Sequence, residues 1–560
     1  MVCPCMKRSE LEAIVNGFGD INLIGSTCIR TAVNKAINAL EALFYENTKL
    51  RNDNQALKDE INTLKGEQGT PKTRKQKNSD NQDNSSEEER KKRKKSGNRK
   101  PKGKKNGKIT IHSRVKCEIS KDLLPPGASF KGYKYATFQD INISPNNVEF
   151  QREVWYSSDL NKSFSAPLPE GYYGQFGPNV RTLVITLHEE GKMTEPAIER
   201  FLKIIGIQIS SSTISRMITD NHGPFHQEKD DIVDAGIESK SCKHMDDTGC
   251  KVNGKNCYTH ILCNPLFTVF FTRPKKDRLT ILEILCRGEL RFLLNQTACD
   301  LMRELGLANK HINKLQPMLN NNALEREDID SILSELFSNP KKNSKINRII
   351  FEATALTYYY QSKHYLQHLM VDDAPQYNRI AEHKSLCWIH EGRHYKKLTP
   401  IAIFHKEAVD TFIGKFWDYY HDLLEYKSSP TKEAAVELSK RFDDLFTTVT
   451  GYEPLDDRIA KTLAKKDNLL LVLAFPLLPL ENNCAELGAR LQARTRDINL
   501  QTRNTKGTEA KDTFATLVQT ARKLGVNFYH YIHDRITKKY EMPSLAQMIR
   551  DRSPPVAGTS

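Results

Sequence analysis

The sequence lacks any apolar run that approaches the roughly 20 residues needed by a membrane-spanning helix. Its N-terminus, Met-Val-Cys-Pro-Cys-Met-Lys-Arg, also has no apolar segment of the kind found in secretory signals. Both absences argue against a membrane protein and against a secreted one. We therefore expect a protein of the cytoplasm.

Paired cysteines are missing as well. The chain has 12 cysteines, but none stands in a C-x-x-C pair, the spacing typical of zinc ribbons and thioredoxin-like redox sites. Cys3 and Cys5 form only a C-x-C near the N-terminus. We expect the others, for example Cys257, Cys263 and Cys387, to be reduced thiols that fill small sites in the core.

Acidic residues are too few to balance the basic ones. The chain has 84 Lys and Arg residues against 69 Asp and Glu, which gives a formal net charge of +15. Such an excess indicates a polyanionic partner, and nucleic acid is the first choice. At 560 residues the chain is long enough for several domains and at least one large core.

Residues 1–66 are predicted to form a helical region with a coiled coil. From about Asn34 to Leu64, apolar and amide side chains repeat every seven residues. This pattern suits a two-stranded parallel coiled coil, because buried amides pair in one register only. A single amphipathic helix packed on its own chain is the alternative, and four consecutive heptads favour the dimer. One core position holds Leu40, Asn47, Asn54 and Ile61, and the other holds Leu43, Leu50, Leu57 and Leu64.

Residues 67–108 form a hydrophilic, low-complexity segment that we expect to be a disordered linker. Between Arg90 and Lys108 it carries basic residues and no acidic ones. Each lysine or arginine that contacts a phosphate releases counterions, so the linker should add DNA affinity that depends on salt and not on sequence. Its densest run is Arg90, Lys91, Lys92, Arg93, Lys94 and Lys95.

Residues 109–177 carry short β-prone segments separated by Pro and Gly turns. The clearest of these segments runs from Val148 to Tyr156. Such a pattern predicts a small β-rich module, or an extended strap along a larger domain.

Residues 178–240 have a helical pattern and are predicted to be a DNA-binding region. The helices Glu195–Ile205 and Ser211–Ile218, separated by a glycine, resemble a helix-turn-helix. Ser212 and Arg216 on the second helix would then contact bases. An ordinary helical hairpin explains the same pattern equally well.

The next region predicts an α/β domain with a mixed sheet. Asn253-Gly254 supplies the two positive-φ residues of a type I′ turn, so the runs on either side predict a hairpin. Phe267–Thr272 predicts a third strand, Tyr365–Val371 a fourth and Lys384–Ile389 a fifth. Three successive strands with a carboxylate on the first indicate a ribonuclease-H-like sheet.

The α/β domain is predicted to span residues 241–535 and to be interrupted twice. Residues of about 290–364 and 406–468 have helical patterns, and a simple sheet does not need helices at these places. We therefore predict that both segments are helical insertions. Residues 536–560, which end in a proline-containing segment, are predicted to be a tail.

Three carboxylates stand where this sheet could hold metal ions. Asp246 lies on the first strand, Asp372 ends the fourth, and Glu486 begins a later helix. Magnesium prefers hard oxygen ligands, so carboxylates that converge from separate elements suffice to bind it. Asp247 and Asp373 complicate the assignment, because strand alternation lets only one member of each Asp-Asp doublet face the centre.

Glu486 also has an explanation that needs no metal. Asn483 could cap the helix, with Glu486 completing a capping box three residues later. Arg490 and Arg494 follow on the same helix face. They would either bind phosphates beside a metal-bound carboxylate or form salt bridges on a surface helix.

Three groups of motifs, taken in order, resemble the transposases of the insertion sequence 66 family. The similarity runs from roughly Pro178 to Val526. It implies a ribonuclease-H-like core whose DDE triad falls on Asp246, Asp372 and Glu486, with two Mg²⁺ or Mn²⁺ ions. The motifs are HMDDTG followed by VNGK, LMVDDAPQYN followed by CWIHEGRHY, and PLENNCAELGAR followed by KGTEAKDTFATLVQTARKLGV.

The family's C-W-x-H-x-x-R pattern falls on Cys387, Trp388, His390 and Arg393. Members of the family commonly carry a zinc-binding, cysteine-rich segment before the helix-turn-helix region. Here Cys117 stands alone, so zinc is not expected there. The candidates for phosphate binding in the catalytic domain are His390, Arg393, Arg490, Arg494 and Arg496.

The resemblance implies a transposase that cleaves DNA at the ends of a mobile element and joins those ends to target DNA. It also implies a bacterial protein of the nucleoid and a homo-oligomer formed through the coiled coil. Two other functions stay open from the residues. One is a nuclease that hydrolyses DNA without joining it, and the other is a DNA-binding coiled-coil protein with a vestigial triad.

Overall fold

The computed structural model describes residues 8–17, 25–64, 110–120, 124, 127–337 and 343–553. The predicted linker at 67–108, with the run from Arg90 to Lys95, lies outside these residues, as do Cys3 and Cys5. The chain splits into two compact units. The first comprises Met1–Gln82, Pro167–Ile198 and Ser211–Ser560, and the second comprises Asp83–Ala166 and Glu199–Ser210.

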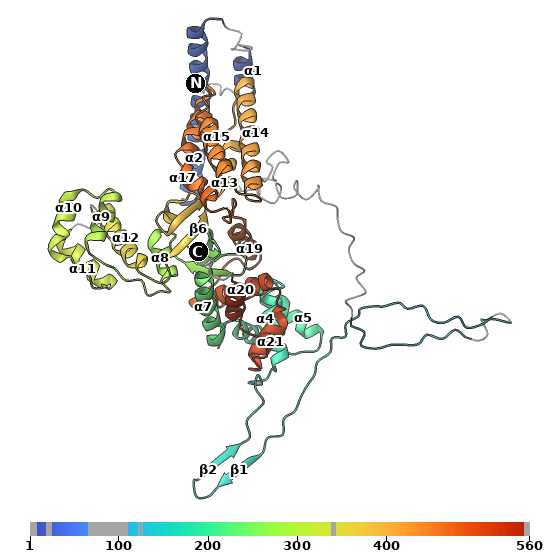
Figure 1. Ribbon diagram of the computed structural model, residues 1–560. Helices are drawn as coiled ribbons and strands as arrows, with labels where there is room; N and C mark the ends of the chain where they lie inside the picture. The colour runs from blue at the N-terminus through green and yellow to red at the C-terminus, as the bar shows by residue number, and fades with distance from the viewer. Residues whose placement is uncertain are drawn as a thin grey trace. The chain divides into compact units, whose positions relative to one another are not determined.

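A five-stranded mixed sheet lies at the centre of the first unit (Figure 1). Its strands, in chain order, are β3 (Lys243–Val252), β4 (Lys255–Cys263), β5 (Thr268–Arg273), β6 (Leu366–Val371) and β7 (Ala381–Leu386). Their spatial order is β5-β4-β3-β6-β7. The first three strands are antiparallel, whereas β6 runs parallel to β3 and β7 parallel to β6. The prediction of an α/β chain with a mixed sheet is confirmed.

The β3–β4 hairpin forms as the sequence predicts. At its tip Asn253 and Gly254 have φ values of 47° and 77°, the left-handed values that a type I′ turn requires. The parallel pairing on the other side of β3 sets Lys243 beside Leu369 and His244 beside Met370. This pairing fixes which residues of β6 face which residues of β3.

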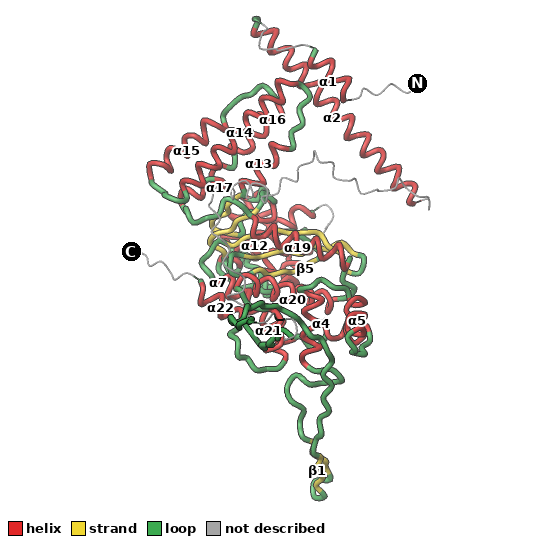
Figure 2. The backbone as a smooth tube through the Cα atoms, turned by 90° about the vertical axis from the view of Figure 1, so that its right-hand side faces the viewer, coloured by secondary structure: helices red, strands yellow, loops and turns green. Residues whose placement is uncertain are grey.

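Helices cover the sheet and extend from it (Figure 2). None of the described helices is long and apolar enough to cross a membrane. The helices before the sheet are α1 (Arg8–Asn16), α2 (Thr27–Leu64), α4 (Pro178–Glu189), α5 (Glu195–Ile204), α6 (Ser211–Thr219) and α7 (Gly223–Glu238). Those between β5 and β7 are α8 (Arg278–Leu285), α9 (Gln296–Glu304), α10 (Asn309–Leu315), η5 (Gln316–Met318), α11 (Arg326–Leu336), α12 (Ser344–Tyr360) and η6 (Pro375–Tyr377). After β7 follow α13 (Trp388–Lys396), α14 (Ile403–Tyr426), α15 (Lys432–Phe446), α16 (Glu453–Leu463), α17 (Lys466–Leu469), α18 (Leu471–Ala474), α19 (Asn483–Asn499), α20 (Thr505–Leu524), α21 (Phe528–Ile536) and α22 (Leu545–Arg552).

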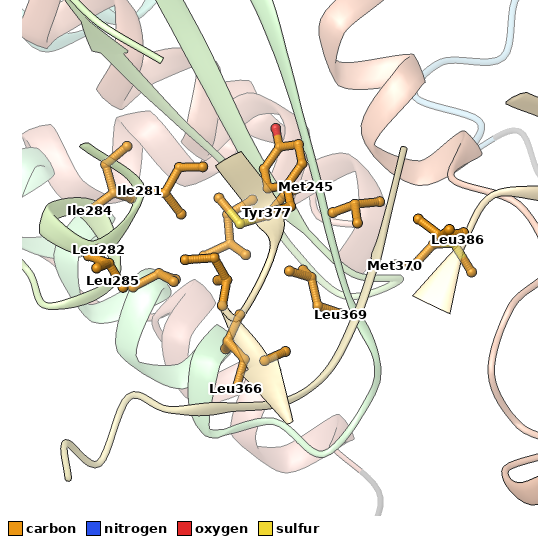
Figure 3. Packing of buried hydrophobic residues seen from close by; sticks show 14 of the residues in the cluster. Met245, Ile281, Leu282, Ile284, Leu285, Leu366, Leu369, Met370, Tyr377 and Leu386 are labelled. Atoms are coloured by element: carbon orange, nitrogen blue, oxygen red, sulfur yellow. The ribbon is translucent and has the colours of Figure 1, made fainter. Parts of the chain in front are cut away.

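The core that fixes the central strands is apolar and fully enclosed (Figure 3). Met245 of β3 and Leu369 and Met370 of β6 are completely buried, and they belong to one cluster with Ile281 and Leu282 of α8. Full burial of each such side chain stabilises the fold by about 1.5–3 kcal/mol. Strand β3, which carries Asp246, and strand β6, which Asp372 follows, therefore pack on one apolar cluster.

The first interruption of the sheet is helical. Its helices α9 to α12 lie between β5 and β6, and α12 packs against α8 and α9. The Tyr359 hydroxyl donates to the Ile380 carbonyl at 3.0 Å, just before β7. This hydrogen bond joins the helical block to the edge of the sheet.

The second interruption, α14 to α16, surrounds an aromatic side chain that the sequence pattern assigns to a strand. The pattern predicts the fifth strand at Lys384–Ile389, but β7 ends at Leu386 and Trp388 begins α13. Trp388 is completely buried against Phe416 of α14 and Phe442 of α15. A short apolar run fits a strand or a helix equally well, and the partners that bury Trp388 come from a distant part of the chain.

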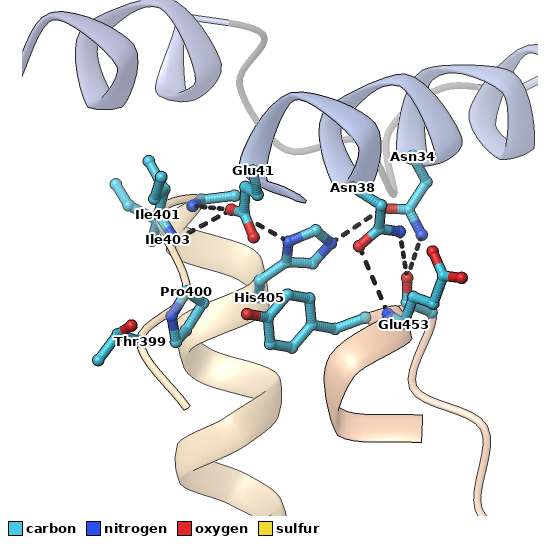
Figure 4. Close-up of polar contacts among 12 residues, drawn as sticks. Asn34, Asn38, Glu41, Thr399, Pro400, Ile401, Ile403, His405 and Glu453 are labelled. Atoms are coloured by element: carbon cyan, nitrogen blue, oxygen red, sulfur yellow. Dashed lines mark hydrogen bonds and ion pairs between the residues drawn. The ribbon is translucent and has the colours of Figure 1, made fainter. Parts of the chain in front are cut away.

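The N-terminal helices dock on α14 through a buried polar network (Figure 4). The Glu41 carboxylate on α2 accepts the backbone N–H groups of Ile401 at 2.9 Å and Ala402 at 2.8 Å. Asn16, at the end of α1, accepts the N–H of Ile403 at 3.0 Å. The first N–H groups of a helix have no partner within it, so these side chains cap α14 from outside. His405 on α14 also contacts Glu41, at 3.4 Å.

A second face of α2 carries the predicted heptad leucines. Leu43, Leu50 and Leu57 are 61%, 61% and 58% exposed, whereas Ile37 on the docked face is 1% exposed. One helix thus packs on its own chain with one face and leaves a leucine row exposed on another. The structure thus shows packing of α2 on its own chain, and the coiled coil through the exposed row stays a prediction.

The helical region before the sheet contains both helices expected of the helix-turn-helix-like pair. They are α5 and α6, and Gly206 after α5 has a φ of 91°. Ile214, Met217 and Ile218 of α6 are buried, and α6 packs on α4 and α20.

The second unit has less strand than the sequence predicts. Among the described residues from 110 to 166, strands are confined to the antiparallel pair β1 (Val154–Ser157) and β2 (Lys162–Ser165). Trp155 and Phe138 are 70% and 87% exposed. A β-rich module needs a buried apolar face, and these two side chains do not provide one.

Part of the predicted tail belongs to the core. Residues 545–552 form α22, which packs on α7 and α20, with Leu545 and Ile549 completely buried. Residues 554–560 lie outside the described part of the chain.

Candidate active site

Asp246 lies on β3 in a half-buried position. Burial raises the pKa of its carboxyl group to about 7, and the nearby carboxylates of Asp372, Asp247 and Glu486 act in the same direction. The N–H of Asp247, which donates to Asp246 Oδ1 at 2.8 Å, opposes this shift. A carboxyl group held among other carboxyl groups in this way is typical of metal and catalytic sites.

Asp372 follows β6 directly. If the pairing of Lys243 with Leu369 is continued along both strands, Asp246 stands beside Asp372. Burial raises the pKa of Asp372, while His390 lowers it. Its Oδ1 accepts the Ala374 N–H at 3.2 Å.

The second members of both doublets already have partners. Asp247 accepts the Gln376 side-chain amide at 3.0 Å and lies 3.4 Å from the Lys276 ammonium. Asp373 pairs with Lys465 at 2.6 Å and lies 3.9 Å from Lys384. Neutralising cations leave these two carboxylates less suited to metal binding than Asp246 and Asp372.

Glu486 stands in the first turn of α19, and the capping-box explanation for it is wrong. Asn482, not Asn483, occupies the N-cap position, and its side chain makes no cap hydrogen bond. Instead, its Oδ1 lies 3.0 Å from His244 Nδ1, and its Nδ2 donates to the Met245 carbonyl at 2.8 Å. Asn482 thereby ties the start of α19 to β3. Sequence reasoning missed it, because Asn483 next to it looks like an equally good cap.

The Glu486 carboxylate points to two residues of α13. Its Oε2 accepts from Arg393 Nη2 at 3.1 Å, and its Oε1 lies 3.6 Å from His390 Nδ1. The side chain of Glu486 is only 11% exposed, and those of His390 and Arg393 are 28% and 24% exposed. The structure therefore brings Glu486 together with two of the predicted phosphate-binding residues, and the charges of Asp372 and Glu486 both act on Asp246.

The remaining candidates differ in their surroundings. Arg494 is exposed on α19, Arg490 is partly buried, and Arg496 donates to the Gly249 carbonyl of β3. Arg496 thus has a structural role that the sequence did not indicate. On α6, Ser212 and Arg216 are exposed, and Arg216 bonds within its own helix, to the Ser212 carbonyl and the Thr213 hydroxyl at 3.3 Å.

Within the described part of the chain, one group of ligand-bearing side chains is close enough to share a single ion. It consists of Cys387, His390 and Glu486, whose ligand atoms lie within 4.8 Å of one another. The carboxylates of Asp246, Asp372 and Glu486 do not form such a close group.

Comparison with known proteins finds that part of the chain is similar to a transposase family. Residues 353–510 match the family model described as "Transposase IS66 family", which confirms the resemblance noted in the sequence. The match contains Asp372, His390, Arg393 and Glu486, whereas Asp246 precedes it. The chain is also 29% identical over 313 residues to "Uncharacterized protein y4jO" of Sinorhizobium fredii (strain NBRC 101917 / NGR234). That alignment covers 54% of this chain and 94% of the relative.

Proposed function

We propose, from the match of residues 353–510 to the Transposase IS66 family, that the protein cleaves DNA at the ends of a mobile element and joins them to target DNA. The observation that carries this proposal is the convergence of Asp246, Asp372 and Glu486 around β3, β6 and the start of α19. The strand order β5-β4-β3-β6-β7, with three antiparallel strands and two parallel ones, supports a ribonuclease-H-like core.

The carboxylates fit divalent cations with oxygen ligands. Asp246 carries a raised pKa among other carboxylates, and Glu486 Oε1 is buried without a hydrogen-bond partner. Asp246, Asp372 and Glu486 would hold two Mg²⁺ or Mn²⁺ ions, which when bound supply an activated water and neutralise the leaving oxygen.

The basic residues around the triad would hold the DNA. Arg393 now neutralises Glu486, and a DNA phosphate would offer its guanidinium a second anionic partner. His390 lies beside it in the first turn of α13. Arg490 and Arg494 extend the basic face along α19 and would bind phosphates farther along the backbone. Together they would align the 3′-hydroxyl of a cleaved end with a target phosphodiester.

The remaining parts of the chain would bring the two element ends together. Ser212 and Arg216 of α6 would read bases in a helix-turn-helix arrangement, and the run from Arg90 to Lys95 would bind phosphates of any sequence. The exposed leucine row on α2 would pair with the same row of a second copy as a coiled coil. A protein with these properties would lie on the nucleoid.

The test is cleavage and joining by purified full-length variants on duplexes that carry the element ends. Asp246→Asn, Asp372→Asn and Glu486→Gln should each abolish cleavage while end binding changes less than about twofold, because an amide keeps the shape but not the charge that metals require. Asp247→Asn and Asp373→Asn are the matched controls and should cleave. The reverse pattern within either doublet would assign the other aspartate.

A strand-transfer reaction with pre-cut ends then separates two functions. A transposase joins such ends to target DNA, whereas a nuclease releases them unjoined. Retention of biological effect in all three triad variants would favour the vestigial DNA-binding protein.

A further inference from the structure

The start of α13 and the start of α19 face each other with three soft or borderline ligands between them. Cys387 is the N-cap residue of α13, and His390 follows in its first turn. Glu486 comes from the first turn of α19. The Cys387 Sγ, a His390 ring nitrogen and a Glu486 carboxylate oxygen all lie within 4.8 Å of one another.

Two polar atoms of these residues are buried without a hydrogen-bond partner. They are His390 Nδ1 and Glu486 Oε1, and they face each other at 3.6 Å. A buried polar atom without a partner is costly and calls for an explanation. In a tetrahedral zinc site with bonds of about 2.0–2.3 Å, ligand atoms stand roughly 3.3–3.8 Å apart. The separation of the two atoms lies in that range.

The surroundings hold the three ligands in place. The Cys387 N–H donates to the Val371 carbonyl at 3.0 Å, and Cys387 Sγ accepts the Asn482 N–H at 3.2 Å. Arg393 holds the other oxygen of Glu486, Oε2, at 3.1 Å, which turns Oε1 toward His390. Hydrogen bonds of this kind orient metal ligands in known sites.

We propose that Cys387, His390 and Glu486 form a binding site for Zn²⁺, separate from the magnesium pair but sharing one ligand with it. Thiolate, imidazole and carboxylate are the donors that zinc takes, whereas magnesium avoids sulfur. The thiol proton leaves to solvent when the ion binds. Three protein ligands leave a fourth position for water or a phosphate oxygen.

The consequence for activity rests on the proposed function. Glu486 cannot coordinate zinc and the magnesium pair fully at the same time. Zinc bound here therefore takes the third carboxylate of the triad away from the magnesium pair. Zinc should therefore inhibit cleavage that magnesium supports.

Binding is tested on the full-length protein with Co²⁺, a spectroscopic substitute for zinc. The wild-type protein should show a thiolate-to-cobalt charge-transfer band, and equimolar Zn²⁺ should remove it. Cys387→Ser should lose the band, and Cys387→Ser and His390→Asn should each bind Zn²⁺ at least about 10-fold more weakly. Cys484→Ser, two residues from Glu486, is the matched control and should keep the band. Thermal unfolding of each variant shows that it is folded.

The site is rejected if the wild-type protein gives no band, if the band survives in Cys387→Ser, or if it is lost in Cys484→Ser. Inhibition is measured as the ratio of cleavage with and without Zn²⁺, so that each variant is compared with itself. Zinc that fills the site should lower this ratio for the wild type and not for Cys387→Ser, and equal inhibition of both would reject the shared ligand. A wild type that cleaves no DNA with Mg²⁺ would overturn the proposed function, while the Co²⁺ result would still decide the metal site.

Discussion

At the residue scale, the contacts around Asp246 and Glu486 distinguish each of them from the residues beside it in the chain. In the doublet Asp246-Asp247, strand alternation lets only one aspartate face the site, but the sequence does not show which one. In the structure, Asp247 contacts the Lys276 ammonium and the Gln376 side-chain amide. Glu486 fits a capping box only when the N-cap is placed at Asn483, one position too late. One residue at a helix start changes which side chain caps it, and sequence patterns do not resolve that difference.

Asn482 provides a prediction at this scale. Asn482→Ala removes the hydrogen bond to the Met245 carbonyl and the interaction with His244, which should lower the free energy of unfolding by about 2 kcal/mol. It should also lower cleavage by the folded protein, because α19 carries Glu486. Urea denaturation measures the first effect and single-turnover cleavage the second.

The matched control is Asn504→Ala, which removes the side-chain cap of α20 on the Gly507 N–H. It should cost about 1 kcal/mol and leave cleavage by the folded protein unchanged. If both variants lose activity in proportion to stability, Asn482 has no special role in placing Glu486.

At the element scale, the sequence predicts the elements that are determined by residues close together in the chain. It does not predict the elements that are determined by packing against residues from other parts of the chain. The β3–β4 hairpin follows from Asn253-Gly254 alone, because the turn is local. By contrast, Trp388 lies in a helix because aromatic residues of α14 and α15 enclose it. In the same way, α22 forms because α7 and α20 bury Leu545. These partners lie far away in sequence, where periodicity gives no information.

His222, which precedes α7, gives a prediction about pH. Its Nε2 donates to the Met217 carbonyl of α6 at 3.0 Å, and burial lowers its pKa to about 4. In the unfolded chain the pKa of histidine is about 6.5. Between these values the unfolded chain binds a proton that the folded protein does not, so stability falls as the pH decreases from about 6.5 to 4. The decrease should reach at most about 3 kcal/mol.

The measurement is the free energy of unfolding by urea at several pH values. His222→Gln should make the dependence on pH shallower over this interval, since glutamine does not titrate. His530→Gln, at an exposed position on α21, is the control and should keep the wild-type slope. An unchanged slope for His222→Gln would contradict the assignment of this proton to His222.

At the scale of the whole molecule, the exposed leucine row on α2 predicts self-association. Leu50→Lys with Leu57→Lys should convert a dimer to a monomer, because two charges would be buried in the seam. Sedimentation measures the mass of each form. Thr48→Lys with Asn52→Lys, on the outer positions of the same heptads, should leave the dimer intact. A wild-type protein that sediments as a monomer would remove the coiled coil from the proposal.

At the same scale, we predict that different parts of the chain supply the general affinity for DNA and the preference for end sequences. Neutralising Arg90 to Lys95 should weaken binding to end sequences and scrambled duplexes by a similar factor, and it should flatten the salt dependence by a slope of about 0.9 for each phosphate that the run no longer binds. Ser212→Ala with Arg216→Ala should instead reduce the preference for end sequences. Titrations at several salt concentrations separate the two effects. If the variant of the basic run loses the preference and the α6 variant keeps it, α5 and α6 do not read the DNA sequence.

The cap that Glu41 places on α14 has a consequence for synthesis. The Glu41 carboxylate and the Ala402 N–H group that donates to it are 361 residues apart in the chain. At about 5–20 residues per second, a ribosome needs roughly 20–70 s to make the second after the first. During that interval α2 is complete, its leucine row is available, and α14 does not yet exist. If the leucine row pairs two copies as proposed, two chains that grow on one messenger RNA would be able to pair through α2 before either has a finished α/β domain, and a pair formed in this way would come from a single transcript.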